Sequence, residues 1–71
     1  MTFGDRLKIA RMACAWSQGD LAAHTGLLQT AISHFEQGRR LPSFANLRTL
    51  CEVLGVSADY LLGFKQHGMW P

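Results

Sequence analysis

Small polar side chains that can form hydrogen bonds with nucleic-acid bases gather in one short stretch of the sequence. Gln29 and Thr30 are followed one helical turn later by Ser33 and His34. A glutamine can pair with adenine through two hydrogen bonds, and a threonine can bond to a base or contact a thymine methyl. Polar helix faces are most often simply solvated. Whether these four side chains read bases or are simply solvated therefore depends on the helices that position them.

The stretch 18–38 reads as a helix, a glycine turn and a second helix. Ser17 and Asp20 form a variant of the capping box where the first helix begins. Gly26 supplies the left-handed conformation that a tight turn requires. The second helix covers 29–37. This is the pattern of a DNA-reading helix-turn-helix, in which the start of the second helix approaches the base edges.

Apolar residues at helical spacing predict three further helices, and the expected fold class is all-α: a compact five-helix domain with the helix-turn-helix at its second and third helices. Serines before the apolar runs and glycines after them mark the helix boundaries. The expected helices cover 3–15, 18–25, 29–37, 44–54 and 58–62. The expected apolar faces comprise Phe3, Leu7, Ala10, Cys14, Leu21, Ala22, Ile32, Phe35, Phe44, Leu47, Leu50, Cys51 and Leu54, with Trp16 as a core plug between helices.

The 71 residues predict one domain over 1–63 and a tail over 64–71 that either contributes a dimer contact or is disordered. The net charge of +2 permits nucleic-acid binding but does not argue for it.

No leader or membrane span is visible, so we expect a cytoplasmic protein that makes no membrane contact. The two isolated cysteines and the three histidines lack metal-ligand spacing, and no catalytic arrangement is recognisable. The cysteines are Cys14 and Cys51, and the histidines are His24, His34 and His67. We therefore expect no metal, no cofactor, no small-molecule ligand and no enzyme activity.

A basic loop directly follows the second helix of the motif. Arg39 and Arg40 stand there with few acidic neighbours, which makes them candidates for contacts with DNA phosphates. Gln37, at the end of the same helix, is assigned to the same phosphate-binding set.

The ordered set of motif residues resembles the Cro and phage-repressor (XRE-type) helix-turn-helix family over about residues 3–63. The matching residues are Arg6-Leu7, Arg11, Trp16-Ser17-Gln18, Leu21-Ala22, Gly26, Ile32-Ser33, Phe35-Glu36, Gly38-Arg39, Pro42-Ser43, Asn46-Leu47, Leu50, Leu54-Gly55-Val56-Ser57 and Asp59-Tyr60-Leu61-Leu62.

The resemblance implies a domain that binds operator DNA as a homodimer, with 29–37 as the recognition helix in the major groove. It implies a phosphate contact by Gln18 together with the amides of its helix N-terminus. It also implies a partly buried ion pair between Arg11 and Glu36. Leu28 departs from the family pattern, because Ser or Thr usually caps the recognition helix. Its side chain leaves a backbone donor less well satisfied and puts an apolar group near the DNA surface.

More apolar side chains lie near the C-terminus than one short helix can hide, and this excess indicates a partner surface. The expected dimer interface comprises Leu62 and Phe64, with Tyr60 next; Trp70 belongs to the tail. Together these features predict a dimeric, sequence-specific transcriptional repressor of phage or prophage origin acting on a pseudo-palindromic operator. The chain would be either a short Cro-like protein or the N-terminal piece of a longer repressor. Alternatives are an antitoxin, a restriction–modification controller, or a protein-interaction module without DNA binding.

Overall fold

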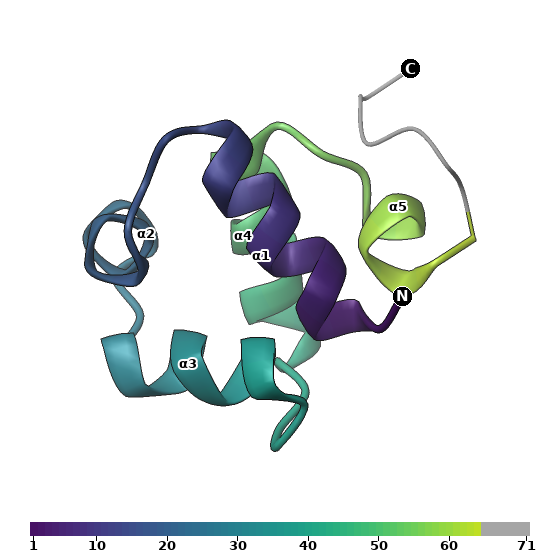
Figure 1. The fold of residues 1–71 in the computed structure, drawn as a ribbon, viewed down its shortest axis with the longest axis horizontal. Coiled ribbons are helices and arrows are strands. Elements are labelled where there is room, and N and C mark those ends of the chain that lie inside the picture. Colours follow the sequence, from purple (N-terminus) through teal and green to yellow (C-terminus); the bar gives the residue numbers. More distant parts are fainter. Residues whose placement is uncertain (65–71) are drawn as a thin grey trace.

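The computed structural model describes residues 1–64, which contain five helices, as the sequence predicts. Residues 65–71, and with them the expectations for His67 and Trp70, lie outside the described residues. In chain order the helices are α1 (Phe3–Ala13), α2 (Gln18–Thr25), α3 (Gln29–Gln37), α4 (Phe44–Leu54) and α5 (Ala58–Leu62) (Figure 1).

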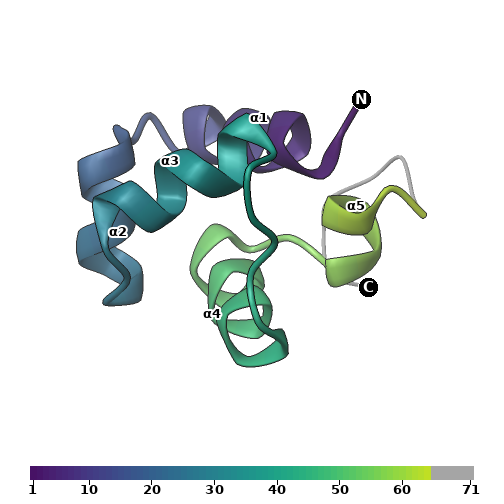
Figure 2. The ribbon, with the colours of Figure 1, turned by 90° about the horizontal axis from the view of Figure 1, so that it is seen from below.

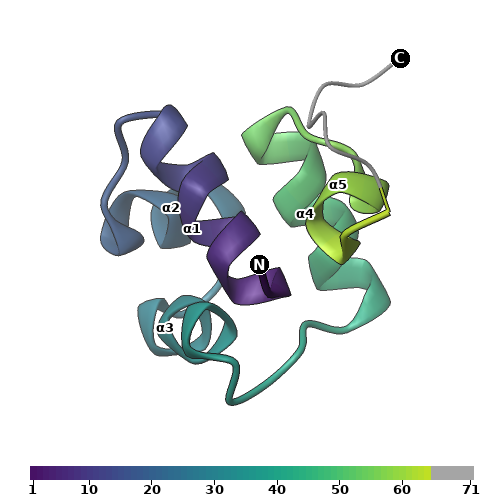
Figure 3. The ribbon, with the colours of Figure 1, turned by 45° about the vertical axis from the view of Figure 1, so that its right-hand side comes forward.

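The helices pack in a closed circuit around one core. α1 lies against α3 and α5, α2 lies against α3 and α4, and α4 packs on α5. Figure 3 shows α1 in front, between α3 and the α4–α5 pair. Each helix buries one aliphatic side chain with no exposed surface: Leu7, Leu21, Ile32, Leu50 and Leu61. The first four belong to one core cluster. Because every helix is anchored by such a residue, the core fixes how α3 sits on the rest of the domain.

Side-chain caps begin four of the five helices. The hydroxyl of Thr2, Ser17, Ser43 or Ser57 accepts a hydrogen bond from the backbone N–H three residues later. At α1 and α2 the aspartate three residues on completes a capping box, and these cap hydrogen bonds hold the pKa values of both carboxyls below the usual value.

The recognition helix of the motif is the one helix without a side-chain cap. Leu28 stands at its N-cap, makes no cap hydrogen bond and is 74% exposed. The absent cap costs the start of α3 about 1 kcal/mol relative to a serine or threonine. The structure therefore matches the expectation that a donor is left less well satisfied at this end.

Helix α1 ends two residues earlier than the sequence predicts, at Ala13. Ala15 adopts a left-handed φ of 59°, which ends the helix. The amide of Trp16 then donates to the Arg11 carbonyl at 3.3 Å, and the amide of Ala15 donates to the Met12 carbonyl at 2.9 Å, the bonding pattern of a Schellman motif. This turn brings the backbone of Trp16 back over the last turn of α1.

Phe44 does not belong to the core, contrary to its place in the predicted apolar stripe of α4. It is 83% exposed, whereas Leu50, Cys51 and Leu54 on the same stripe are buried. Leu50 and Leu54 belong to the buried core cluster, and Phe44 does not. The indole of Trp16 is half-buried against the core, as expected of a plug, and it also stacks on the His24 ring with the centroids 4.1 Å apart.

Gly4 allows α1 to approach α3 more closely than any larger residue could. It is buried, and a Cβ atom placed there would collide with the Glu36 carbonyl oxygen and lie 2.7 Å from the Phe35 carbonyl oxygen. Both obstacles are backbone atoms at the end of α3, which cannot turn aside as a side chain would. The glycine therefore sets the distance between the first and third helices.

We predict that Gly4→Ala lowers the free energy of unfolding by about 1–3 kcal/mol, because relieving the collision must shift α3 away from α1. Urea denaturation followed by circular dichroism measures the change. Gly19→Ala is the matched control: Gly19 also occupies the second position of its helix, but an added Cβ would meet side chains and no backbone, the flexible end of Gln29 at 3.3 Å and the Ser17 hydroxyl at 3.7 Å. An equal loss in both variants would contradict the close-approach explanation.

Candidate nucleic-acid interface

Helix α3 presents a polar face to solvent on the side opposite its core residues. Ile32 and Phe35 are buried, so residues half a turn away face outward. In Figure 2, which is seen from below the view of Figure 1, α3 passes in front of α1 and lies beside α2. Of the four predicted base-reading residues, Gln29 and Thr30 are exposed and Ser33 and His34 are half-buried. All four lie on the one helix, within two turns of each other.

The carboxamide of Gln29 lies over the start of α2. Its Oε1 atom is 3.3 Å from the position that a Cβ of Gly19 would occupy, and the Ser17 hydroxyl is 3.7 Å from the same position. The space left by Gly19 therefore lets the first side chain of α3 rest against the N-terminus of α2. Sequence reasoning did not single out Gly19; a glycine at the second position of a helix, where it lowers helix propensity, was the available signal.

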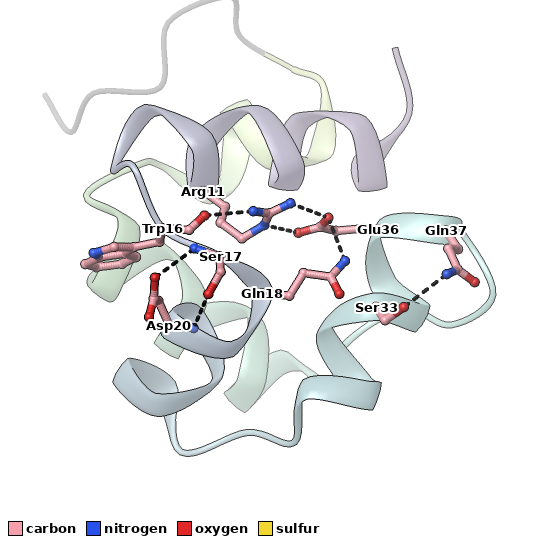
Figure 4. A network of polar contacts seen from close by, with 8 residues as sticks. All are labelled: Arg11, Trp16, Ser17, Gln18, Asp20, Ser33, Glu36 and Gln37. Carbon is pink, nitrogen blue, oxygen red and sulfur yellow. Dashed lines mark hydrogen bonds and ion pairs between the residues drawn. The ribbon is translucent and has the colours of Figure 1, made fainter.

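A bidentate ion pair joins Arg11 of α1 to Glu36 of α3 (Figure 4). The guanidinium donates from Nε to Glu36 Oε2 at 2.7 Å and from a terminal nitrogen to Oε1 at 3.0 Å. The side chains are only 10% and 4% exposed. The other terminal nitrogen donates to the Trp16 carbonyl at 2.7 Å. The hydrogen bonds to Glu36 raise the pKa of Arg11 above its usual value, which keeps the guanidinium charged.

Gln18 completes this network from α2. Its Nε2 atom donates to Glu36 Oε1 at 3.2 Å, so one carboxylate connects three helices. Because the capping box engages the amide of Asp20, the amides of Gln18 and Gly19 have no partner within α2 itself. The side chain expected to bind phosphate is thus held beside the helix N-terminus by a charged anchor, with its second N–H still available.

Ser33 and Gln37 form a second polar contact along the outer face of α3. Gln37 Nε2 donates to the Ser33 hydroxyl oxygen at 3.0 Å across one helical turn (Figure 4). Gln37 is exposed and Ser33 is half-buried. The structure therefore brings a predicted phosphate-binding residue into contact with a predicted base-reading residue.

The loop after α3 carries two exposed cations. Gly38 adopts a left-handed φ of 77°, and the amide of Arg39 donates to the His34 carbonyl at 2.9 Å, which ends the helix and turns the chain. Arg39 and Arg40 both lie in solvent immediately beyond this turn. They are thus displayed at the C-terminal end of α3, and Gln18 lies by the N-terminal end of α2.

The three residues predicted to form the dimer interface differ in their exposure to solvent. Leu62 is 49% exposed and Phe64 is 77% exposed, whereas Tyr60 is half-buried beneath the Arg6 guanidinium, whose Cζ lies 5.1 Å from the ring centroid. An open apolar groove, which the sequence analysis did not foresee, lies between α4 and α5. Its lining residues are Phe44, Leu47, Arg48, Cys51 and Ala58.

Residues 1–64 contain no group of three or more histidine, cysteine, aspartate or glutamate side chains able to hold a metal ion. Cys51 is buried, and burial raises the pKa of its thiol, which disfavours the reactive thiolate. No helix in this part of the chain is long and apolar enough to cross a membrane.

Replacing Arg11 should strongly destabilise the fold, because it leaves the buried Glu36 carboxylate without its counterion. We predict that Arg11→Met lowers the free energy of unfolding by about 3–5 kcal/mol, and that adding Glu36→Leu restores part of the loss. Urea denaturation of both variants tests this. The control is Arg48→Ala, which breaks the exposed Arg48–Glu52 pair at 3.7 Å and should change stability by at most about 1 kcal/mol. A loss for Arg11→Met no larger than that for the control would contradict a structural role.

The sequence matches known regulators over most of its length. The family model described as a helix-turn-helix domain matches residues 2–61. A prophage-derived uncharacterized HTH-type transcriptional regulator, YonR of Bacillus subtilis, is 37% identical over 60 residues, which cover 84% of this chain and 56% of that protein. The regulator ImmR of the same organism is 35% identical over 89% of this chain and 50% of its own length. The chain thus spans about half the length of these curated relatives.

Solved structures agree with the fold. The P22 c2 repressor in complex with a synthetic operator superposes with a TM-score of 0.87 at 31% identity, covering 92% of this chain and 98% of that one. The restriction–modification controller protein C.AhdI from Aeromonas hydrophila gives a TM-score of 0.79 at 33% identity over 84% of this chain and 91% of its own. With the match over residues 2–61, they show that the chain belongs to the helix-turn-helix family of DNA-binding transcriptional regulators, of the Cro and phage-repressor type.

Proposed function

We propose that this chain is a sequence-specific transcriptional repressor that binds a pseudo-palindromic operator as a homodimer. The observation that carries the proposal is the outward polar face of α3, with cations at its end and an amide anchored at the start of α2. An α-helix fits the major groove of B-DNA, where each base pair presents a distinct set of donors and acceptors. The prophage origin of one relative and the operator bound to the P22 c2 repressor support repression as the role.

Within this proposal the contacts divide by chemistry. Gln29, Thr30, Ser33 and His34 read base edges from α3. Gln18, Arg39 and Arg40 hold the phosphate backbone on either side, and the second N–H of Gln37 adds a phosphate contact. The ion pair keeps the Glu36 carboxylate, with its side chain 4% exposed, from repelling that backbone. A restriction–modification controller is the second candidate role, favoured by the likeness to C.AhdI.

The homodimer would form through the α4–α5 face. Leu62 follows Ala58 by four residues on α5, so both lie on one side of that helix, and Ala58 lines the groove that also contains Phe44. The exposed Phe44 and Leu62 thus extend the groove into an apolar patch of the kind that marks partner surfaces, and Phe64, just after α5, is exposed as well. A second copy is the occupant that fits, because a two-fold axis pairs such a patch with itself and matches the symmetry of a palindrome.

Selection of bound sequences from a random DNA pool, followed by titration of variants, tests the DNA-reading proposal. Gln29→Ala should cost about 1–3 kcal/mol on the selected site and little on random DNA. Arg40→Ala should weaken binding to both and reduce the slope of log K against log salt by about one unit. Lys8→Ala removes an exposed cation of α1 and serves as the control for charge alone. Equal losses for Gln29→Ala on both DNAs would refute base reading.

Sedimentation equilibrium of the free protein tests the homodimer. A charge placed in the α4–α5 patch, as Leu62→Glu or Phe44→Glu, should shift the protein toward monomer, because pairing of the patch would bury the new carboxylates. Met12→Glu is the matched control, since Met12 is 59% exposed on the outer face of α1. Dimerisation that survives both patch variants, or that Met12→Glu abolishes equally, would place the interface elsewhere.

A further inference from the structure

The hydroxyl of Ser33 is bonded differently from the threonine hydroxyls inside the other helices. Thr25 Oγ1 donates to the Leu21 carbonyl at 2.8 Å, and Thr49 Oγ1 donates to the Ala45 carbonyl at 3.1 Å. These are the usual bonds of a helical hydroxyl to the carbonyl four residues earlier. Ser33 instead accepts a hydrogen bond, from Gln37 Nε2 at 3.0 Å. The Ser33 hydroxyl proton is therefore not donated to a backbone carbonyl of α3.

The bond from Gln37 fixes the polarity of this hydroxyl. A serine oxygen offers one O–H donor and two lone pairs, and the Gln37 amide occupies one lone pair from the C-terminal side of the helix. The O–H must then point away from Gln37. Hydroxyl groups that accept one hydrogen bond become better donors in the next, because the two bonds polarise each other.

We propose that Ser33 and Gln37 act as one recognition unit, in which Gln37 positions Ser33 as a hydrogen-bond donor to an acceptor atom on a base edge in the major groove. Such acceptors are purine N7, guanine O6 and thymine O4. The inference rests on the DNA-reading function proposed above and deepens it. Gln37 is the positioning residue, and Ser33 makes the contact.

The location of the pair supports a base contact. Ser33 follows Gln29 by one turn of α3, so the two lie on neighbouring parts of the helix surface, and not on the side of the buried Phe35. Ser33 is half-buried and Gln37 is exposed, so the shorter side chain lies beneath an amide that reaches solvent. The remaining Oε1 and second N–H of Gln37 stay available to the DNA or to water.

A double-mutant cycle on the full chain tests the unit, with the sequence selected from a random pool as cognate site. Ser33→Ala should lower cognate affinity about 3- to 10-fold, the effect of one hydrogen bond, with random DNA unchanged. Gln37→Ala should lower cognate affinity about 2- to 3-fold more than it lowers affinity for random DNA, and this excess should vanish when Ser33 is already alanine. The loss that is common to both DNAs is that of the phosphate contact proposed for Gln37. Selection repeated with Ser33→Ala should lose its base preference at one position of each half-site.

Thr49→Ala is the matched control, because it removes a helical hydroxyl whose proton is bonded to its own backbone. It should leave affinity and base preference unchanged. In the free protein, the side-chain amide NMR signals of Gln37 should shift in Ser33→Ala but not in Thr49→Ala.

The outcomes separate this proposal from the function on which it rests. Wild-type protein that selects no preferred sequence overturns the repressor function and the unit together. A selective wild type with independent effects of Ser33→Ala and Gln37→Ala overturns the unit alone. A loss for Ser33→Ala that is equal on cognate and random DNA makes Ser33 a phosphate contact, which overturns its role at a base.

Discussion

The ion pair between Arg11 and Glu36 is the interaction on which the arrangement of the first three helices depends. It joins α1 to α3 through two hydrogen bonds, holds the turn after α1 through the Trp16 carbonyl, and holds α2 through Gln18. Buried ion pairs often contribute little net stability compared with apolar residues of the same shape. This one is better understood as a device that fixes geometry. Its bidentate form restricts the placement of α3 relative to α1, and it satisfies the Glu36 carboxylate, whose side chain is only 4% exposed.

Gly4 imposes a second constraint on the same pair of helices, and it acts through the same residue. The ion pair uses the side chain of Glu36, whereas Gly4 lies against its backbone carbonyl. The two contacts lie near opposite ends of α1, and both hold the C-terminal end of α3 against that helix. A helix that must match the spacing of base pairs benefits from such double restraint, because misplacement by a fraction of an ångström weakens hydrogen bonds to bases.

The recognition helix itself is unevenly supported. Buried side chains and the ion pair hold its inner face, but its N-terminus has no side-chain cap. An uncapped helix start at a surface proposed to meet DNA fits the general observation that local rules are relaxed at functional sites. In the same way Phe44, Leu62 and Phe64 leave apolar surface in water, which is costly for a monomer and expected of a protein that pairs.

The sequence by itself determined the five helices, nearly all of their boundaries and the central core residues, because capping serines, terminal glycines and apolar periodicity are local signals. The polar character of the outer face of α3 was readable for the same reason. Only the tertiary structure decided which groups meet. It placed the Gln18 amide on Glu36, the Gln29 amide beside Gly19, and the Phe44 ring in water. Those outcomes depend on how separate helices cross, and the distances between helices are set by packing against each other rather than by the residues of any one helix.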